Sequence, residues 1–315
     1  MTRDGHGSRG RVGLWTAAFE GHPAGPVREA AAEIEELGYG ALWFGEAFGR
    51  DTVGQAWLLL SATRRLVVAS GIANIAFRDP VAMATATRTL GEAFPGRYVL
   101  GLGGHRVDDT PRTLDGYPLP ARARAAATLR GYLASMDAVP AHGPAPDPAP
   151  RRVLAALGPR MLRLAAEETW GAHTYFVPVE HTARAREIMG PDAFLAVEQA
   201  VVLDDDRDRA YRTAEAHVTA YLRHAPHQEA NVRRLGFGDE DVRGPSRRLV
   251  DAIVAHGDLS AVERRVREHL DAGADHVCLQ VLGHDPAVLP RREWRELAAA
   301  LVPAPPSRGD RAPAG

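Results

Sequence analysis

Short apolar segments alternate with longer segments of helical periodicity along most of the chain. The apolar segments are 4–9 residues long and rich in Val, Leu, Ile and aromatic residues. Such runs are typical of strands that are buried on both faces. The predicted strands are Val12–Thr16, Ala41–Phe44, Leu66–Ile72, Tyr98–Leu102, Val153–Leu157, Ala172–Val177, Leu195–Leu203 and His276–Leu282.

The segments between these strands predict helices with one apolar face. Ala30, Ile34 and Leu37 have the spacing of a helix that packs on a sheet, and Gly38 follows as its C-terminal cap. The predicted helices are Val27–Leu37, Val53–Thr63, Pro80–Phe94, Arg122–Met136, Pro159–Glu168, His181–Met189, Asp206–Leu222 and Arg291–Leu301.

Eight strands that alternate with eight helices favour an α/β fold, a (β/α)₈ barrel of the TIM type. An open Rossmann-type sheet has the same local pattern, but it would need Gly-x-Gly-x-x-Gly directly after the first strand. Here that strand is followed by Ala17-Ala18-Phe19-Glu20-Gly21, which does not fit. We expect the barrel to span residues 11–302, with a disordered N-terminus (1–10) and a disordered Pro-rich tail (303–315).

The sequence between the seventh and eighth strands is too long for one helix. Beyond Asp206–Leu222, the segments Gln228–Leu235, Ser246–His256 and Leu259–Ala272 also have helical patterns. The chain therefore predicts a helical insertion between strands 7 and 8, near the mouth of the barrel.

The composition excludes several kinds of chemistry. The chain has no lysine, so all 38 basic residues are arginine. Schiff-base, pyridoxal-phosphate and Walker-A chemistry each need a lysine amine and are excluded. The net charge of −2 and scattered arginines predict no nucleic-acid or membrane surface. One cysteine and the absence of His-x-His after the first strand predict no metal site. Without a signal-like or membrane-length apolar segment, we expect a cytoplasmic location.

Candidate site residues follow the strands, because function in such barrels lies at the C-terminal ends of the strands. Glu46 ends the second strand and could serve in acid/base chemistry, or could instead cap a helix or pair with an arginine. The third strand reads Ser70-Gly71-Ile72-Ala73-Asn74, and its internal glycine indicates a bulge. Asn74 offers a donor and an acceptor to a heterocycle, or alternatively satisfies a turn.

Two further strand ends are rich in glycine. The fourth ends Gly101-Leu102-Gly103-Gly104-His105, where bare backbone would let a flat ligand approach and histidine titrates near neutral pH. The fifth continues into Gly158-Pro159-Arg160, where a helix N-terminus and a guanidinium suit an anion. A glycine-rich turn and a plain strand-to-helix connection are the alternative interpretations.

Together these segments resemble the luciferase-like monooxygenase superfamily, in particular its actinobacterial coenzyme F420-dependent oxidoreductases. The resemblance covers roughly Val12 to Val302. Its most specific part is Phe94-Pro95-Gly96-Arg97-Tyr98-Val99-Leu100-Gly101-Leu102-Gly103. Leu42-Trp43-Phe44-Gly45-Glu46, Ser70 to Asn74 with Arg78-Asp79-Pro80, Leu154 to Met161 and Ala272 to Val277 also carry it.

The resemblance implies a barrel that binds a deazaflavin or flavin ring at the strand ends and transfers a hydride between this ring and a small organic substrate. It implies Glu46 beside the ring. It implies Ser70, Gly71, Ile72 and Asn74 in the bulge behind the ring, with a cis Gly71–Ile72 peptide bond. It implies Gly103, Gly104 and His105 beside the ring, and Gly158, Pro159 and Arg160 on the phosphate side.

Hydride transfer also requires a proton donor or acceptor. We expect His105 in this role, with Glu46 orienting the ring or the histidine, because histidine titrates nearer neutral pH. The cofactor is expected to be F420. The alternatives are an FMN-dependent monooxygenase that needs a partner reductase, and a barrel that binds a cofactor without turnover. Glu168-Thr169-Trp170-Gly171 and the loop from Arg106 to Tyr117 depart from the family pattern, so the substrate is not inherited. The oligomeric state stays open, although dimers are common in the family.

Overall fold

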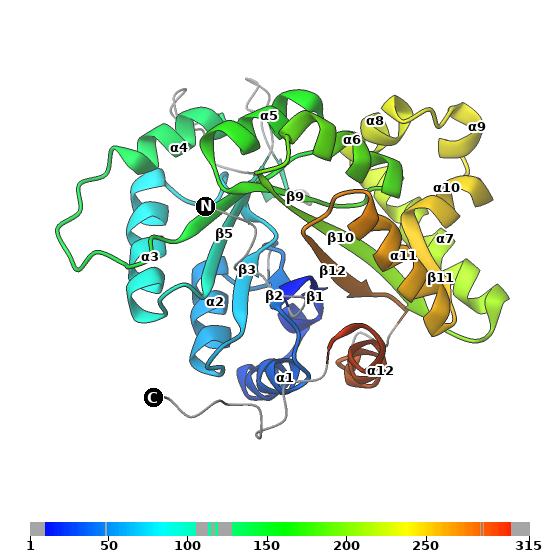
Figure 1. Ribbon diagram of the computed structural model, residues 1–315, viewed down its shortest axis with the longest axis horizontal. Helices are drawn as coiled ribbons and strands as arrows, with labels where there is room; N and C mark the ends of the chain where they lie inside the picture. Colours follow the sequence, from blue (N-terminus) through cyan, green and yellow to red (C-terminus); the bar gives the residue numbers. More distant parts are fainter. Residues whose placement is uncertain are drawn as a thin grey trace, which may run out of the picture.

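Eight parallel strands form a closed barrel surrounded by helices in the computed structural model (Figure 1). The structure describes residues 10–47, 49–104, 128–283, 285 and 287–303, and the backbone of a short antiparallel pair, β6 (Thr113–Leu114) and β7 (Tyr117–Pro118). The barrel strands follow the order β1-β2-β3-β5-β8-β9-β10-β12, and β12 pairs with β1 to close the circle. The predicted (β/α)₈ barrel is confirmed.

The strands have the following bounds: β1 Val12–Thr16, β2 Ala41–Phe44, β3 Val67–Ser70, β4 Ala73–Asn74, β5 Tyr98–Gly103, β8 Arg151–Ala155, β9 Gly171–Thr174, β10 Phe194–Leu203, β11 Val254–Gly257 and β12 His276–Val281. The helices are η3 Ala18–Gly21, α1 Ala24–Glu36, α2 Thr52–Ser61, α3 Pro80–Ala93, α4 Leu129–Asp137, α5 Pro159–Glu168, α6 Val179–Met189, α7 Arg207–His224, α8 Pro226–Arg234, α9 Asp239–Val242, α10 Arg247–Ile253, α11 Leu259–Asp271 and α12 Arg291–Leu301.

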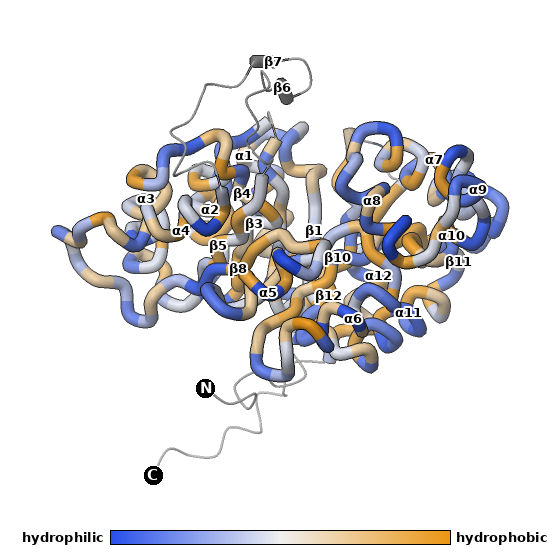
Figure 2. The backbone as a smooth tube through the Cα atoms, turned by 90° about the horizontal axis from the view of Figure 1, so that it is seen from above, coloured by the Kyte–Doolittle hydropathy of each residue, from blue (hydrophilic) through white to orange (hydrophobic). Residues whose placement is uncertain are grey.

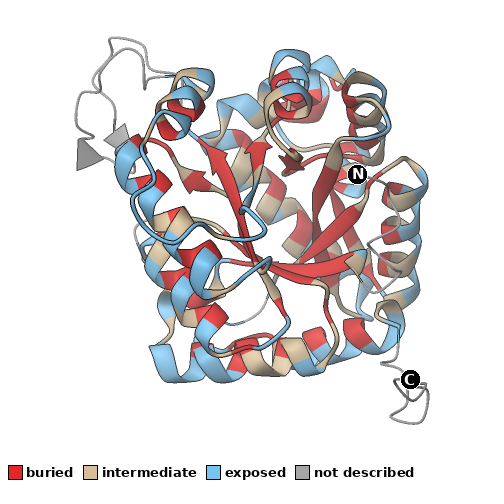
Figure 3. Cartoon of the chain, turned by 60° about the vertical axis from the view of Figure 1, so that its left-hand side comes forward, coloured by how far each residue is buried: buried red, intermediate tan, exposed pale blue. Residues whose placement is uncertain are grey.

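Alternate side chains of each strand point into the barrel or out toward the helices. Outward residues such as Leu14 and Leu42 join the large core beneath the helices. Inward residues such as Trp15, Trp43 and Val99 fill the barrel. Both faces of the strands are therefore buried, and the helices keep their exposed faces outside (Figure 3). This double burial explains the continuous apolar runs in the sequence.

Strand β10 is ten residues long and changes partners along its length. Its first part pairs with β9 and β12, whereas Ala200–Leu203 pairs with β11. Helices α7 to α10 bury a second core against this end of β10, with Val218, Leu249 and Ile253 among its members. The insertion therefore sits on one side of the barrel, away from α2 and α3 (Figures 1 and 2). The predicted helical insertion is confirmed.

Several element boundaries differ from the prediction, and two of these differences have a clear structural cause. The expected helix Ser246–His256 ends at Ile253, and Val254–Gly257 forms strand β11 instead. The expected strand Ala172–Val177 ends at Thr174, because Phe176 takes a left-handed conformation with φ 57° that no strand can continue through. Gly38, with φ 87°, ends the first helix as expected.

Other expectations concern residues that lie outside the described part of the chain. These are the disordered ends 1–10 and 303–315, apart from Gly10 and Pro303, and the first residues of the expected helix Arg122–Met136. Over the described residues, no helix is long and apolar enough to cross a membrane.

Candidate active site

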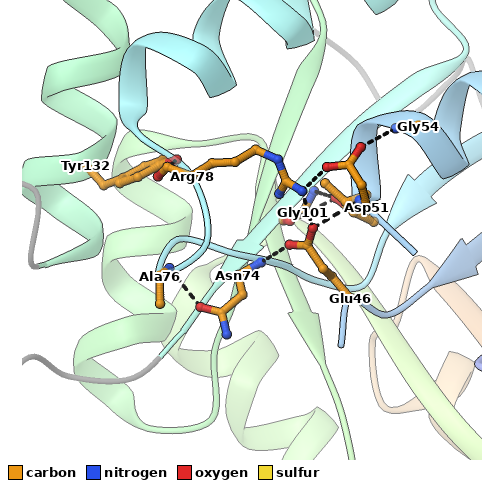
Figure 4. Close-up of polar contacts among 10 residues, drawn as sticks. Glu46, Asp51, Gly54, Asn74, Ala76, Arg78, Gly101 and Tyr132 are labelled. Carbon is orange, nitrogen blue, oxygen red and sulfur yellow. Dashed lines mark hydrogen bonds and ion pairs between the residues drawn. The ribbon is translucent and has the colours of Figure 1, made fainter. Parts of the chain in front are cut away.

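Glu46 connects three loops at the C-terminal end of the barrel (Figure 4). Its carboxylate follows β2 and is only 1% exposed. Oε2 accepts a hydrogen bond from the Asn74 backbone N–H (2.8 Å), and Oε1 accepts one from the Thr52 backbone N–H (3.0 Å). The Arg78 guanidinium donates to Oε1 at 2.5 Å and also pairs with Asp51, the N-cap of α2. Glu46 thus holds the β2 loop, the β3 bulge and α2 together.

Two alternatives to a role beside the cofactor ring were considered for Glu46, a helix cap and a partner of an arginine, and the structure contains both kinds of contact. The carboxylate pairs with an arginine, and it accepts the N–H of the first residue of α2. A role as a positioning residue follows directly from these bonds. Its contact with a reacting atom stays a prediction.

The bulge after β3 brings the predicted residues Ser70, Gly71, Ile72 and Asn74 together. A cis peptide bond joins Gly71 to Ile72, as expected. The Ser70 hydroxyl donates to the Gly101 carbonyl and accepts from the Gly101 N–H, both at 2.9 Å. Trp15 Nε1 donates to the Gly71 carbonyl at 2.9 Å. Asn74 Oδ1 accepts the Ala76 N–H at 2.8 Å, which leaves the Asn74 amide nitrogen for another partner.

Close packing explains why glycine stands beside this bulge. A Cβ on Gly103 would lie 2.6 Å from the Ile72 side chain and 2.9 Å from Ala155 Cβ. A Cβ on Gly71 would lie 2.9 Å from Trp15 Nε1 and 3.0 Å from His173 Nε2. Gly104 has φ 140°, which disfavours any side chain. Protein side chains therefore fill the space beside Gly71 and Gly103, and only glycine fits at these two positions.

The N-terminus of α5 gathers groups that suit an anion. Gly158 is its N-cap and Pro159 its first residue, as predicted, and Arg160 is exposed. Arg234, from α8, brings Nη2 to 3.6 Å from the position of a Cβ on Gly158. The same nitrogen donates to Asn231 Oδ1 at 3.0 Å. Asn231 is 1% exposed, and its amide nitrogen has no hydrogen-bond partner among the residues that the structure describes. A guanidinium, an orphaned amide and a helix N-terminus form a donor set that fits a phosphate.

His173 lies inside the barrel on β9 and was not predicted. It is 2% exposed, and its ring stacks on Trp43 with centroids 4.6 Å apart. Within the described part of the chain, neither ring nitrogen of His173 has a hydrogen-bond partner. Burial, with a smaller effect from His276, lowers the pKa of His173 to about 3, so the ring is neutral.

Glu198 is a second unpredicted polar residue inside the barrel, on β10. It is 2% exposed. Oε2 accepts the backbone N–H of Phe176 at 3.1 Å, whereas Oε1 has no partner. Burial raises the pKa of Glu198 to about 8, despite the opposing hydrogen bond from Phe176, so the carboxyl is mainly protonated at neutral pH. Both residues could have been noticed in the sequence as polar residues within the apolar segments that form β9 and β10.

One candidate lies outside the described residues. His105, the expected proton donor or acceptor, follows Gly104, where the described segment ends. Within the described residues, no group of three or more His, Cys, Asp or Glu could hold a metal ion.

The closed ring of eight parallel strands surrounded by helices defines a TIM-type barrel, and the bulge after β3 and the N-terminus of α5 form its candidate ligand site. A family model for luciferase-like monooxygenases matches residues 6–276, and the chain belongs to this family. An F420-dependent glucose-6-phosphate dehydrogenase of Intrasporangium calvum is 24% identical to the chain. The alignment covers 87% of this chain and 93% of that protein.

Solved structures share the fold at lower identity. The F420-dependent tetrahydromethanopterin reductase of Methanopyrus kandleri superposes with a TM-score of 0.65 at 17% identity, over 93% of this chain and 98% of that one. The oxygenating component of a Pseudomonas putida 3,6-diketocamphane monooxygenase, solved with FMN, has a TM-score of 0.66 at 16% identity, over 93% and 97%. Relatives of this family are F420-dependent or FMN-dependent oxidoreductases and monooxygenases, so the chain is assigned to an enzyme family whose cofactor is a deazaflavin or a flavin.

Proposed function

We propose that this protein is an F420-dependent oxidoreductase that transfers a hydride between the deazaflavin and a small organic molecule. The donor set at α5 is the observation that carries the proposal. Arg234 lies beside the helix N-terminus at Gly158 and bonds Asn231, and this guanidinium at a helix N-terminus suits the phosphate of a bound cofactor. The name of the Intrasporangium relative supports F420 over FMN.

The chain's own residues would hold and orient the cofactor. Glycine at positions 71 and 103 lets the bulge pack closely against Trp15 and Ala155, and this packing would shape the surface on which the ring lies. Glu46, through the Asn74 N–H and Arg78, fixes the bulge behind that ring. Buried Trp15 supports the bulge by donating a hydrogen bond to the Gly71 carbonyl. When bound, the deazaflavin supplies two-electron hydride chemistry, and the protein supplies position and proton handling.

Fluorescence titration of the purified protein with F420, and separately with FMN, tests the cofactor. Arg234→Ala and Arg160→Ala are each expected to weaken F420 binding about 10- to 100-fold, or ~1.5–3 kcal/mol for a charge-assisted hydrogen bond. Arg163→Ala, an exposed arginine further along α5, is the matched control. Unchanged affinity in both variants would place the phosphate elsewhere. Tight binding of FMN with no binding of F420 would favour the monooxygenase alternative.

His105 remains our proposed proton donor or acceptor, with Glu46 as the positioning residue. Single-turnover kinetics on His105→Ala and Glu46→Gln at saturating cofactor test this assignment. If His105→Ala keeps the hydride-transfer rate and its pH profile, the assignment is wrong.

A further inference from the structure

Aromatic side chains gather beside the bulge, and Trp15, which bonds the Gly71 carbonyl, links the two groups of residues. Five aromatic residues, here called the aromatic cluster, come from β1, the end of β9 and α7: Trp15, Tyr175, Phe176, His217 and Tyr221. Trp15 and Tyr175 have ring centroids 5.2 Å apart, and Phe176 stacks on Tyr221 at 5.0 Å. Tyr175, Tyr221 and His217 are partly exposed, so the cluster presents an accessible edge.

A chain of hydrogen bonds with a fixed direction crosses this cluster. Tyr175 donates its hydroxyl hydrogen to Gln280 Oε1 at 2.7 Å, since a carbonyl oxygen can only accept. The bond between the Tyr221 and Tyr175 hydroxyls, at 2.6 Å, must then run from Tyr221 to Tyr175. Gln280 is thereby oriented through its oxygen. Its amide nitrogen, near the C-terminal end of β12, makes no hydrogen bond to the residues that the structure describes, so its two N–H donors are offered to a ligand in the proposal below.

The side chains of the aromatic cluster are uncharged at neutral pH. This sets them apart from the chain as a whole, in which 25% of the residues are charged. Burial lowers the pKa of His217 to about 4, so its ring is neutral. Burial raises the pKa of Tyr221 to about 12, and that of Tyr175 also rises. Glu198, which holds the Phe176 N–H, is mainly protonated. An anionic ligand would find no opposite charge among these residues.

We propose that the aromatic cluster and Gln280 bind the organic substrate, a small uncharged molecule with an apolar ring and a carbonyl oxygen. This inference rests on the proposed function. The ring packs on Tyr175, Tyr221 and His217. The carbonyl oxygen accepts a hydrogen bond from the Gln280 amide. Sugar phosphates, the substrate class named for the Intrasporangium relative, are disfavoured because none of the described residues of the aromatic cluster, nor Gln280, offers their phosphate a cation.

Three probes separate the parts of this proposal without requiring turnover. Binding of cyclohexanone, 4-oxocyclohexanecarboxylate and methylenecyclohexane to the protein is measured by ligand-observed NMR, with and without F420. Cyclohexanone is expected to bind at least about tenfold tighter than the carboxylate, which adds a charge, and than the hydrocarbon, which lacks the acceptor. Equal or tighter binding of the carboxylate, or no binding of cyclohexanone, would overturn the proposal.

Variants localise the binding. Gln280→Leu removes the donor, and Tyr221→Phe keeps the ring but breaks the hydrogen-bond chain. Each is expected to weaken cyclohexanone binding about 3- to 10-fold. Tyr211→Phe, on the same helix but packed against His256, is the matched control. F420 affinity, measured by fluorescence, should stay unchanged in all three variants. If Gln280→Leu and Tyr221→Phe weaken cyclohexanone binding no more than the control Tyr211→Phe does, the assignment of the substrate site is wrong. If the wild-type protein does not bind F420, the proposed function is wrong instead.

Discussion

The buried carboxyl of Glu198 is expected to make the stability of this protein fall as the pH rises. Its pKa in the folded state is about 8, against 4.5 for an ordinary glutamate. The unfolded chain loses this proton above about pH 4.5, whereas the folded protein keeps it until about pH 8. The stability that this group contributes is therefore fully present below pH 4.5 and is lost as the pH rises toward 8.

The shift sets the size of the effect. A pKa difference between 4.5 and about 8 corresponds to about 5 kcal/mol once the pH exceeds both values, and to about 3 kcal/mol at neutral pH. Glu198→Gln removes the titration but keeps an oxygen that can accept the Phe176 N–H. The variant should therefore gain stability relative to wild type as the pH rises, up to these limits.

Urea unfolding, followed by tryptophan fluorescence between about pH 5 and 9, measures the difference between the two proteins. Because all other titrating groups are shared, they cancel in this difference. Glu167→Gln, on the exposed face of α5, controls for the loss of one surface carboxyl. A difference between Glu198→Gln and wild type that stays constant within about 1 kcal/mol across this range would refute the reasoning.

Two further predictions concern the bulge after β3 and its neighbours. Arg78→Met leaves the buried Glu46 carboxylate without its cation. Urea unfolding should therefore show a free energy of unfolding lower by about 3 kcal/mol or more. A decrease below about 1 kcal/mol would contradict this view of the ion pair. Gly103→Ala forces its new methyl group against Ile72 and Ala155. We expect the free energy of unfolding to fall by about 1–3 kcal/mol and F420 binding to weaken. Unaltered F420 binding, measured by fluorescence, would show that the ring does not lie beside Gly103.

Much of the fold could be predicted from the sequence because barrel strands are buried on both sides. Val12–Thr16 and Ala41–Phe44 were predicted with their observed bounds. Strand β11 was missed because Ile253 and Val254 continue one apolar run, with no breaking residue between helix and strand. The chain changes from helix to strand here because Val254–Gly257 pairs with the end of β10, about 50 residues earlier in the chain. A pairing over this distance leaves no local signal in the sequence.

The site could be predicted only where it consists of backbone and strand ends. Ser70, Gly71, Ile72 and Asn74 lie together as expected, because one bulge contains them all. Arg234 and Asn231 were missed because the insertion folds back on α5, a contact that no spacing encodes. Glu198 was missed because a single polar residue in an apolar strand has the same appearance whether it faces the barrel interior or the helices.

The two parts of the site differ in how freely they can change. The part at Gly71 and Gly103 is closely packed, and almost any substitution there adds atoms that have no room. The part at Tyr175, Tyr221 and Gln280 is made of side-chain tips, and two of these three stand next to or within the inserted helices. Exchanges there can remodel what the barrel accepts while the packing around the bulge is untouched. For an engineer seeking new substrates, the productive library is therefore narrow: α7, the residues after β9, and the end of β12.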